Sequence, residues 1–255
     1  LVDNVQLLFL VFLRVGAMFF ETPFLGSRMV PLQIRGAIAF MVTLISFPVI
    51  QAGGYQFPNG DFPALAAAAV NELAIGLALG FIANLYMMAF QLSGQFFSVQ
   101  LGFGIVEVMD PMAEISVPII GQLLSLFATL IFIAIDGHRL LLEAVIRSFR
   151  VCPNFSMAAT GGMLEMLGGM MRGLFEISFV LAAPVMGTVF VVEVALGVLT
   201  RAAPQMNVMM LGFPIKIVFG LLILVAVMPQ IGMLTEQLFD LMFRDAARFL
   251  QVMAG

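Results

Sequence analysis

The chain has 255 residues, of which 62% are hydrophobic and 10% are charged, and its formal net charge is −4. Soluble domains average about 45–50% apolar and ~25% charged residues. An apolar excess of this size cannot be buried in one soluble core, so the composition predicts an integral membrane protein. The net negative charge, with Lys216 as the one lysine, argues against nucleic acid as a partner.

The N-terminal part of the chain predicts two helices and then one very long apolar stretch. The first helix is expected over Val5–Phe20, and the second over Pro31–Val49, with the proline in the first turn, where its missing N–H is harmless. Turn residues over Gln51–Pro63 predict a loop. The apolar stretch Ala64–Phe103 would span about 60 Å as a helix, twice the hydrocarbon layer. It is either two helices or one long helix that projects beyond the membrane.

A break of unusual composition follows, from Phe103 to Glu114. It contains Glu107, Asp110 and Glu114 and no base, interleaved with large apolar side chains. A loop facing lipid would leave its backbone N–H and C=O groups without partners. The stretch is therefore either enclosed by protein, where it can line a cavity, or an ordinary short connection.

Further apolar helices and a polar elbow come next. Val117–Ile135 predicts a helix that is interrupted at Asp136–Arg139 and then continues amphipathically. A long apolar arm, Phe175–Leu199, leads to the elbow, Leu199–Asn207, and a second apolar arm follows the elbow. Each arm has the ~20 residues that a membrane crossing needs.

The C-terminal segment has a different pattern. Between Ile231 and Met253, apolar residues recur at helical spacing with three acids and two bases between them, which predicts an amphipathic helix. Such a helix can lie on a membrane surface or dock against a partner. Surface helices favour Lys and Arg, so the acidic balance favours docking.

Five charged residues within apolar segments are expected to be buried against protein or water: Arg14, Glu72, Glu176, Glu193 and Lys216. A charge at bilayer depth costs ~2.5–3.5 kcal/mol even on the gentlest scale. These residues could form a proton or ion relay, as in a small secondary transporter or ion channel that uses buried glutamates, or they could pair between helices. The arginines of the connections give no consistent orientation for six simple crossings under the positive-inside rule.

The sequence contains no recognisable catalytic, cofactor-binding or metal-binding constellation. Its one histidine, His138, has no second His or Cys for a metal site. Its one cysteine, Cys152, excludes an internal disulfide framework and a cysteine-based metal cluster. Gly102-Phe-Gly104 is too short for a dinucleotide fingerprint. We therefore expect a chain that is not an enzyme and that uses no cofactor.

The elbow resembles the most distinctive segment of a known family, the FliR export-gate subunits of the flagellar type III secretion apparatus, which are related to the SctT subunits of injectisomes. Two weaker matches stand in the same order and spacing, namely Gln100-Leu-Gly102 leading to Asp110-Pro111, and Asp136-Gly137-His138. The resemblance covers essentially the whole chain, and the chain length favours the flagellar members. The elbow motif reads Leu196-Gly-Val-Leu-Thr-Arg201-Ala-Ala-Pro204-Gln205-Met-Asn207-Val, followed by Gly212-Phe-Pro214.

The resemblance implies an all-α, membrane-associated protein in which about six hydrophobic segments form bent helical hairpins, followed by the C-terminal amphipathic helix. As a single domain over 1–255, it would consist of N-terminal hairpins (1–105), a plug loop (103–114), C-terminal hairpins (115–228) and an amphipathic tail (229–255). In the family, the loop after the long third segment plugs the pore. The corresponding residues here are Phe103, Gly104, Ile105, Val106, Glu107, Val108, Met109, Asp110 and Pro111.

The function implied by the resemblance is that of a structural pore and gate subunit, which helps to form and seal the channel through which unfolded flagellar substrates are secreted. Its partners would be FliP-like and FliQ-like subunits in a hetero-oligomeric helical gate. FlhB-like and FlhA-like export components, proximal rod proteins and unfolded export substrates would contact the gate. The chain would reside in the bacterial inner membrane, within the flagellar basal body, raised toward the periplasm.

Overall fold

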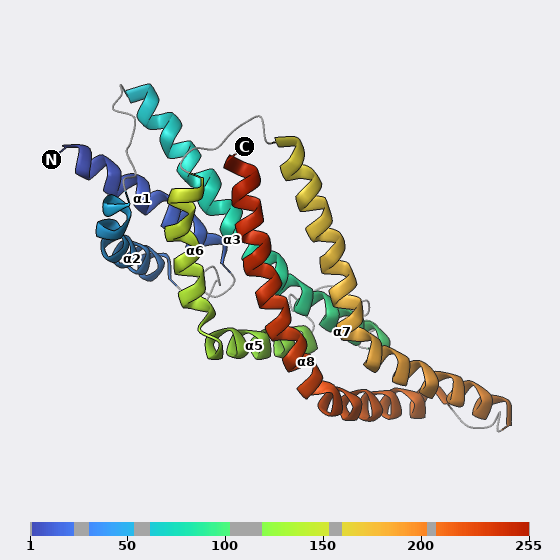
Figure 1. The fold of residues 1–255 in the computed structure, drawn as a ribbon. Helices are drawn as coiled ribbons and strands as arrows, with labels where there is room; N and C mark the ends of the chain where they lie inside the picture. The colour runs from blue at the N-terminus through green and yellow to red at the C-terminus, as the bar shows by residue number, and fades with distance from the viewer. Residues whose placement is uncertain are drawn as a thin grey trace. The chain divides into compact units, whose positions relative to one another are not determined.

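The computed structural model describes residues 2–22, 31–53, 62–102, 119–152, 160–202 and 208–254, and the regular structure in these ranges is helical (Figure 1). Five of the helices in these ranges are long and apolar enough to cross a membrane, and the pair α5–α6 adds a sixth crossing if it is counted as one broken span. The predicted all-α class is confirmed. The helices are α1 (Val2–Glu21), α2 (Leu32–Ala52), α3 (Phe62–Leu101), α5 (Ile119–Ala134), α6 (Gly137–Val151), α7 (Thr160–Ala202) and α8 (Val208–Ala254).

The three longest helices exceed the thickness of a bilayer core. α3 has 40 residues, α7 has 43 and α8 has 47. At a rise of ~1.5 Å per residue they are about 60–70 Å long, whereas the hydrocarbon layer is ~30 Å thick. The long apolar stretch before position 103 is therefore one helix rather than two. The amphipathic segment Ile231–Met253 is the C-terminal part of α8, because the helix continues through Pro229.

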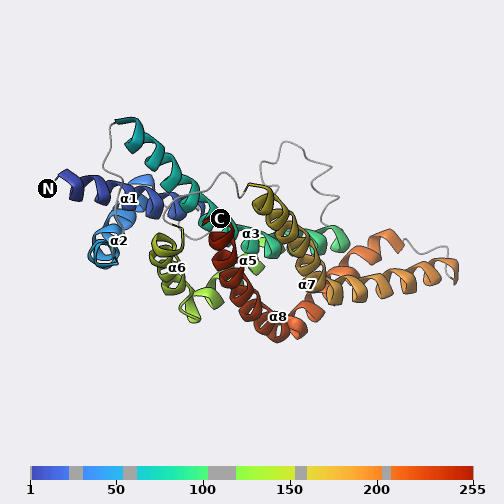
Figure 2. The ribbon, with the colours of Figure 1, turned by 45° about the horizontal axis from the view of Figure 1, so that its top comes forward.

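The ribbons of α7 and α8 change direction along their length in both views (Figures 1 and 2). α7 contains Pro184 inside the helix, and α8 contains Pro214 and Pro229. An interior proline removes a backbone hydrogen bond and clashes with the preceding turn, which is a common cause of helix kinks. The bending of these two arms thus has a local cause in the sequence.

The interruption predicted at Asp136 is a sharp break. The chain bends by 70° between α5 and α6. Asp136 has φ 56° and ψ 31°, a left-handed conformation that aspartate tolerates better than most residues. Gly137 is needed beside it, because a Cβ added there would overlap the ring of Phe132.

The chain forms two compact units. The first comprises Leu1–Tyr86, Phe132–Met171 and Leu238–Gly255, and the second comprises Met87–Ile131 and Arg172–Gln237. α3, α7 and α8 each contribute to both units, so neither unit is a continuous piece of sequence. The division into hairpins, plug loop and tail remains a prediction.

Glycines permit the close helix crossings within each unit. In the first unit, a Cβ on Gly76 of α3 would overlap the carbonyl group of Arg14 in α1. In the second unit, a Cβ on Gly94 of α3 would overlap the backbone of Gly121 in α5. In membranes, helices associate through close van der Waals packing, and small residues allow it.

Gly94→Ala should therefore destabilise the second unit, although alanine is the better helix former. Alanine normally stabilises a helix interior by ~1 kcal/mol relative to glycine. At position 94 the new methyl group meets backbone that cannot rotate away, and overpacking costs ~1–3 kcal/mol. The measurement is the temperature at which the detergent-extracted chain aggregates, followed by size-exclusion chromatography after heating.

Gly187→Ala in α7 is the matched control, because a Cβ at this position meets nothing within 4 Å. We expect Gly94→Ala to lower the aggregation temperature and Gly187→Ala to maintain or raise it. Equal temperatures for the two variants would contradict the close crossing of α3 and α5.

Candidate functional site

A fully buried polar cluster in the first unit forms around Arg14 of α1, and Glu72 of α3 is equally inaccessible. The Arg14 Nε and Nη2 atoms donate to the two carboxylate oxygens of Glu72, with Nη2 at 3.0 Å from Oε1. Nη1 donates to the Ser148 hydroxyl of α6 at 2.9 Å, and Nη2 also donates to the Cys152 carbonyl at 3.2 Å. The guanidinium carbon lies 4.0 Å from the centroid of the Phe149 ring. These five residues are called the Arg14 cluster below.

The contacts of the Arg14 cluster compensate a charge that water cannot reach. Taking an ion out of water costs several kcal/mol, and its attraction to a partner offsets this only with good geometry and further hydrogen bonds. Arginine suits such a site because its planar fork matches a carboxylate with two parallel hydrogen bonds. The Ser148 hydroxyl accepts from Arg14 and donates to the Val145 carbonyl at 2.7 Å. The cluster therefore fixes α1, α3 and α6 to one another.

Cys152 lies just after α6, and its side chain is fully buried. Burial raises the pKa of the Cys152 thiol, the charge of Arg14 lowers it and that of Glu72 raises it. Because the thiolate is the reactive form, a raised pKa reduces reactivity at neutral pH, and burial blocks access as well. Since the chain has one cysteine, its thiol reports whether the Arg14 cluster is closed.

A second ion pair links the two long arms of the second unit. The Lys216 ammonium of α8 donates to Glu193 Oε1 of α7. In contrast to the Arg14 cluster, the two side chains keep 25% and 37% of their surface exposed. Both residues lie in segments that are long and apolar enough to cross a membrane. Exposure of a charge to lipid is costly, so the open side of this pair must face water or another protein.

The structure brings four of the five charges singled out in the sequence into two interhelical ion pairs, Arg14 with Glu72 and Glu193 with Lys216. This arrangement favours pairing between helices over an open relay. Glu176 of α7 is exposed in the chain. Glu176 was expected to face protein or water rather than lipid, and this chain does not enclose it.

The described residues include part of the elbow. Arg201 is exposed in the last turn of α7, and Gly212 and Pro214 lie in the first turns of α8. A Cβ on Gly212 would lie 3.3 Å from Leu196 Cδ1, so this glycine lets the two arms approach each other. Pro204, Gln205, Asn207 and the whole predicted plug, 103–111, lie outside the described residues.

Sequence patterns do not reveal two further polar contacts in the first unit. The Tyr86 hydroxyl of α3 donates to Asp245 Oδ2 of α8 at 2.6 Å. The Asn84 amide of α3 donates to the Glu21 carboxylate of α1 at 3.4 Å. Tyr86 is one of two tyrosines in the chain and lies in an apolar helix. A polar residue in such a helix indicates that its side chain makes a polar contact. The local sequence does not indicate the partner, because Asp245 lies 159 positions further along the chain.

The fold and these contacts define a class, a helical membrane protein whose charged side chains hold helices together. Over the described residues, no group of three or more His, Cys, Asp or Glu side chains is placed to hold a metal ion. The family model described as bacterial export proteins, family 1, matches residues 5–242. The chain belongs to the FliR family, whose members are structural proteins of the type III export apparatus and not enzymes.

Individual relatives agree with this assignment. The chain is 32% identical to the flagellar biosynthetic protein FliR of Bacillus subtilis (strain 168), over 94% of this chain and 93% of the relative. It is 30% identical to the FliR protein of Escherichia coli (strain K12), over 93% of this chain and 90% of the relative. It is 28% identical to the surface presentation of antigens protein SpaR of Shigella flexneri, over 84% and 82% of the two lengths.

The family resemblance of the elbow is thus confirmed, and the chain is a membrane component of the flagellar type III export apparatus. The alternative of a small secondary transporter or ion channel finds no support in these comparisons. The two ion pairs agree with a structural role, because Glu72 and Glu193 each have a cationic partner.

Arg14→Met should destabilise the first unit strongly, and so should Glu72→Met. Removing one partner of a buried pair leaves the other charge uncompensated, which costs ~3–5 kcal/mol. The double variant removes both charges and should cost less than the sum of the two single variants. Maleimide labelling of Cys152 under native conditions measures the effect, since we expect faster labelling in each single variant and slower labelling again in the double variant.

Glu143→Met is the control for this cycle. Glu143 pairs with Arg139 on α6 at 3.5 Å, with 42% and 74% of the two side chains exposed. Exposed pairs contribute ~0–1 kcal/mol, so labelling of Cys152 should not change. Labelling of Arg14→Met at the wild-type rate would mean that the cluster does not hold the helices together.

Proposed function

We propose that this chain is a structural pore and gate subunit of the flagellar type III export apparatus, which helps to form and seal the channel through which unfolded flagellar substrates are secreted. The observation that carries the proposal is the poor coverage of the two longest helices. In the 18-residue apolar stretches that mark α7 and α8 as candidate spans, 22% and 17% of the residues are buried inside the chain, against 61% in the corresponding stretch of α3. Most residues of these two stretches are therefore not enclosed by this chain.

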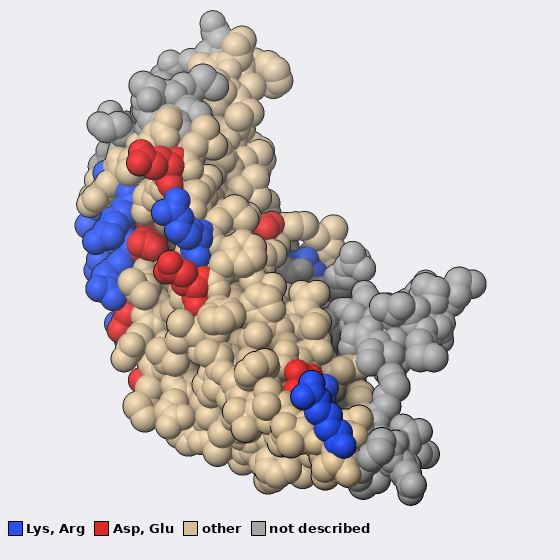
Figure 3. All heavy atoms as spheres, turned by 90° about the vertical axis from the view of Figure 1, so that its right-hand side faces the viewer, with Lys and Arg blue, Asp and Glu red and all other residues tan. Residues whose placement is uncertain are grey.

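Lipid alone does not account for these surfaces. α7 and α8 have 43 and 47 residues and are about 65–70 Å long, twice the hydrocarbon thickness. They also expose charge, at Glu176 and at the Glu193–Lys216 pair. Figure 3 shows a largely uncharged face with local groups of charged residues. Long apolar helices with a few exposed charges suit contact with partner helices or with a water-filled channel.

The partners in this proposal are FliP-like and FliQ-like subunits in a hetero-oligomeric helical gate. FlhB-like and FlhA-like export components and proximal rod proteins would adjoin the gate, and unfolded export substrates would pass through it. Membership of the FliR family and the uncovered helices support this arrangement. The site of assembly would be the bacterial inner membrane within the flagellar basal body. Helices longer than the bilayer is thick support a gate that is raised toward the periplasm.

Within this gate, the loop Phe103–Pro111 would plug the pore, and the elbow from Arg201 to Pro214 would join the two arms. Two observations support the plug role. The loop combines large apolar residues with acids and does not suit exposure to lipid. The chain also leaves α3 abruptly, because Gly102 has φ +88° beside the Phe213 ring.

Native mass spectrometry tests the gate proposal. The tagged chain, extracted in mild detergent from cells that express its neighbours, should carry several copies of two other small membrane proteins. The uncovered faces of α7 and α8 are the reason to expect this complex. The chain expressed without its neighbours is the control. A monomer or simple homodimer that is reproducibly free of partners in both samples would overturn the proposal.

Deleting Phe103–Met109 should raise the ion leak through the reconstituted complex, because a gate without its plug no longer seals. Deleting 54–60, a predicted loop of the same length outside the plug, is the control and should leave the leak unchanged. Conductance across planar bilayers measures both, with native mass spectrometry to show that each variant still assembles. An assembled plug deletion that leaks no more than wild type would refute the plug role.

A further inference from the structure

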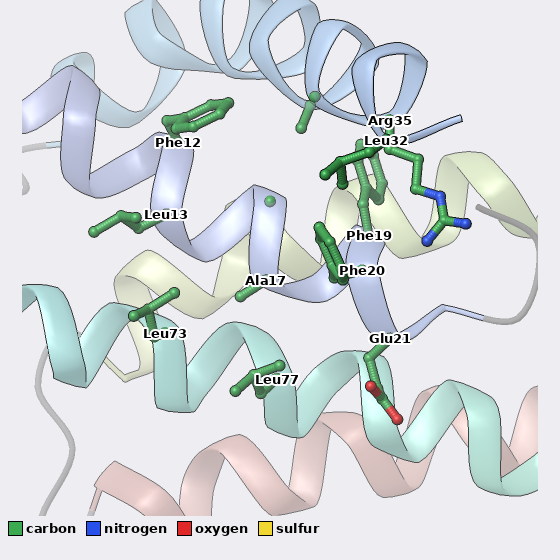
Figure 4. Close-up of a pocket in the computed structure, with 13 residues that line it drawn as sticks. Phe12, Leu13, Ala17, Phe19, Phe20, Glu21, Leu32, Arg35, Leu73 and Leu77 are labelled. Carbon is green, nitrogen blue, oxygen red and sulfur yellow. The ribbon is translucent and has the colours of Figure 1, made fainter. Parts of the chain in front are cut away.

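An apolar pocket in the first unit lies between α1, α2 and α3 (Figure 4). Its volume of 390 Å³ lies within the range of ~300–1,000 Å³ for pockets that bury small ligands. The pocket wall takes part in one contact described above, between the Asn84 amide and the Glu21 carboxylate. Its apolar wall includes Phe12 and Leu13 of α1, Leu32 of α2, and Leu73 and Leu77 of α3.

Two glycines keep this pocket open. Gly16 of α1 and Gly36 of α2 both line it, and a Cβ added to either would meet nothing within 4 Å. Gly76 is different, because there a Cβ would overlap the neighbouring helix. Glycine stabilises a helix less than alanine does, and no close helix crossing requires it at 16 or 36. Its presence at these two positions leaves space for a ligand.

The pocket has both an anion and a cation at one end. Figure 4 shows Glu21 and Arg35 at the same end, while Phe12, Leu13 and Leu73 lie toward the other. Glu21 and Arg35 are both half-buried. A ligand that fits this pocket therefore has a long apolar part and a headgroup with charges of both signs.

Both charged groups already have partners within the chain, and each group still has capacity for a ligand. The Arg35 guanidinium lies over the Phe20 ring, 5.8 Å from its centroid. The Glu21 carboxylate accepts from the Asn84 amide at 3.4 Å. A guanidinium has five N–H donors and a carboxylate has about four acceptor positions, so each can also bind a ligand group.

We propose that the pocket binds a phospholipid whose headgroup carries a phosphate and a primary ammonium, the phosphatidylethanolamine class. Arg35 donates to the phosphate, Glu21 accepts from the ammonium, and an acyl chain occupies the apolar part. An anionic headgroup without an amine is repelled by Glu21, and a quaternary ammonium has no N–H to donate to it. This inference rests on the membrane location and the geometry of the first unit, not on the gate proposal.

A second pocket offers a place for the second acyl chain. Its volume is 380 Å³, and it shares Glu21 and Leu77 with the first pocket. Its other walls are apolar and include Phe81 of α3, Leu167 of α7 and Phe249 of α8. The two apolar pockets thus adjoin the same carboxylate, as a lipid with two chains and one headgroup requires.

The first test is native mass spectrometry of the full chain, extracted with its neighbours and then titrated, after lipid removal, with lipids that share their acyl chains. The lipids are phosphatidylethanolamine, phosphatidylcholine and phosphatidylglycerol. We expect one phosphatidylethanolamine to be retained on extraction and to rebind more tightly than the other two. Gly36→Leu fills the pocket and should weaken rebinding about tenfold or more, the scale of a lost favourable contact. Gly187→Leu adds the same side chain at an open position of α7. In Gly187→Leu complexes that still carry the neighbouring subunits, rebinding should not change.

Headgroup selectivity supplies a second readout that does not depend on filling the pocket. Glu21→Gln should lower the preference for phosphatidylethanolamine over phosphatidylcholine about tenfold, the loss expected for a charge-assisted hydrogen bond. Arg35→Gln should weaken the binding of all three phospholipids. Rebinding that is equal in Gly36→Leu and Gly187→Leu, or a wild-type chain that shows no preference for phosphatidylethanolamine, would overturn the proposal. Retention of no lipid by the extracted complex would overturn it too, and would indicate that a partner covers the pocket.

Discussion

The Arg14 cluster imposes the constraint on which the rest of the first unit depends. A fully buried guanidinium needs its partners in place, since an uncompensated charge away from water costs more than most side-chain contacts contribute. Those partners come from α3 and α6, 58 and 134 positions along the chain. Membrane helices insert individually before they pack, so Arg14 and Glu72 are stable in the apolar phase only once α1 and α3 have met. The same pair therefore selects the docked arrangement over looser ones.

The close crossing of α1 and α3 and the Arg14–Glu72 ion pair depend on neighbouring residues of α3. Glu72 and Gly76 are four residues apart, so they lie on the same face of α3. The glycine admits the Arg14 carbonyl, and the glutamate one turn earlier binds the Arg14 side chain. A larger residue at 76 would push α1 away and would move the guanidinium out of reach of the carboxylate. Packing and electrostatics thus depend on the same few residues.

The sequence predicted the kinds of elements better than their limits or their partners. Hydrophobic runs located the helices, and the polar stretch at Asp136 located the break, because both are local signals. Pro229 did not end α8, since proline is tolerated in long membrane helices when neighbouring groups satisfy the freed backbone. Charge in an apolar run marked Arg14 and Glu72 as unusual, but composition could not say that they pair with each other.

The sequence could not say what covers Glu176, for a related reason. The cost of charge in lipid says only that a residue must avoid lipid, and it does not say whether this chain or another one covers it. The two ion pairs differ in whether this chain covers them. The Arg14–Glu72 pair is closed within the chain, whereas the Lys216 and Glu193 side chains keep 25% and 37% of their surface open. The Arg14–Glu72 pair is therefore completed when the chain itself folds. The second pair, together with Glu176 on the poorly covered α7, is not enclosed by this chain and must face water or another protein.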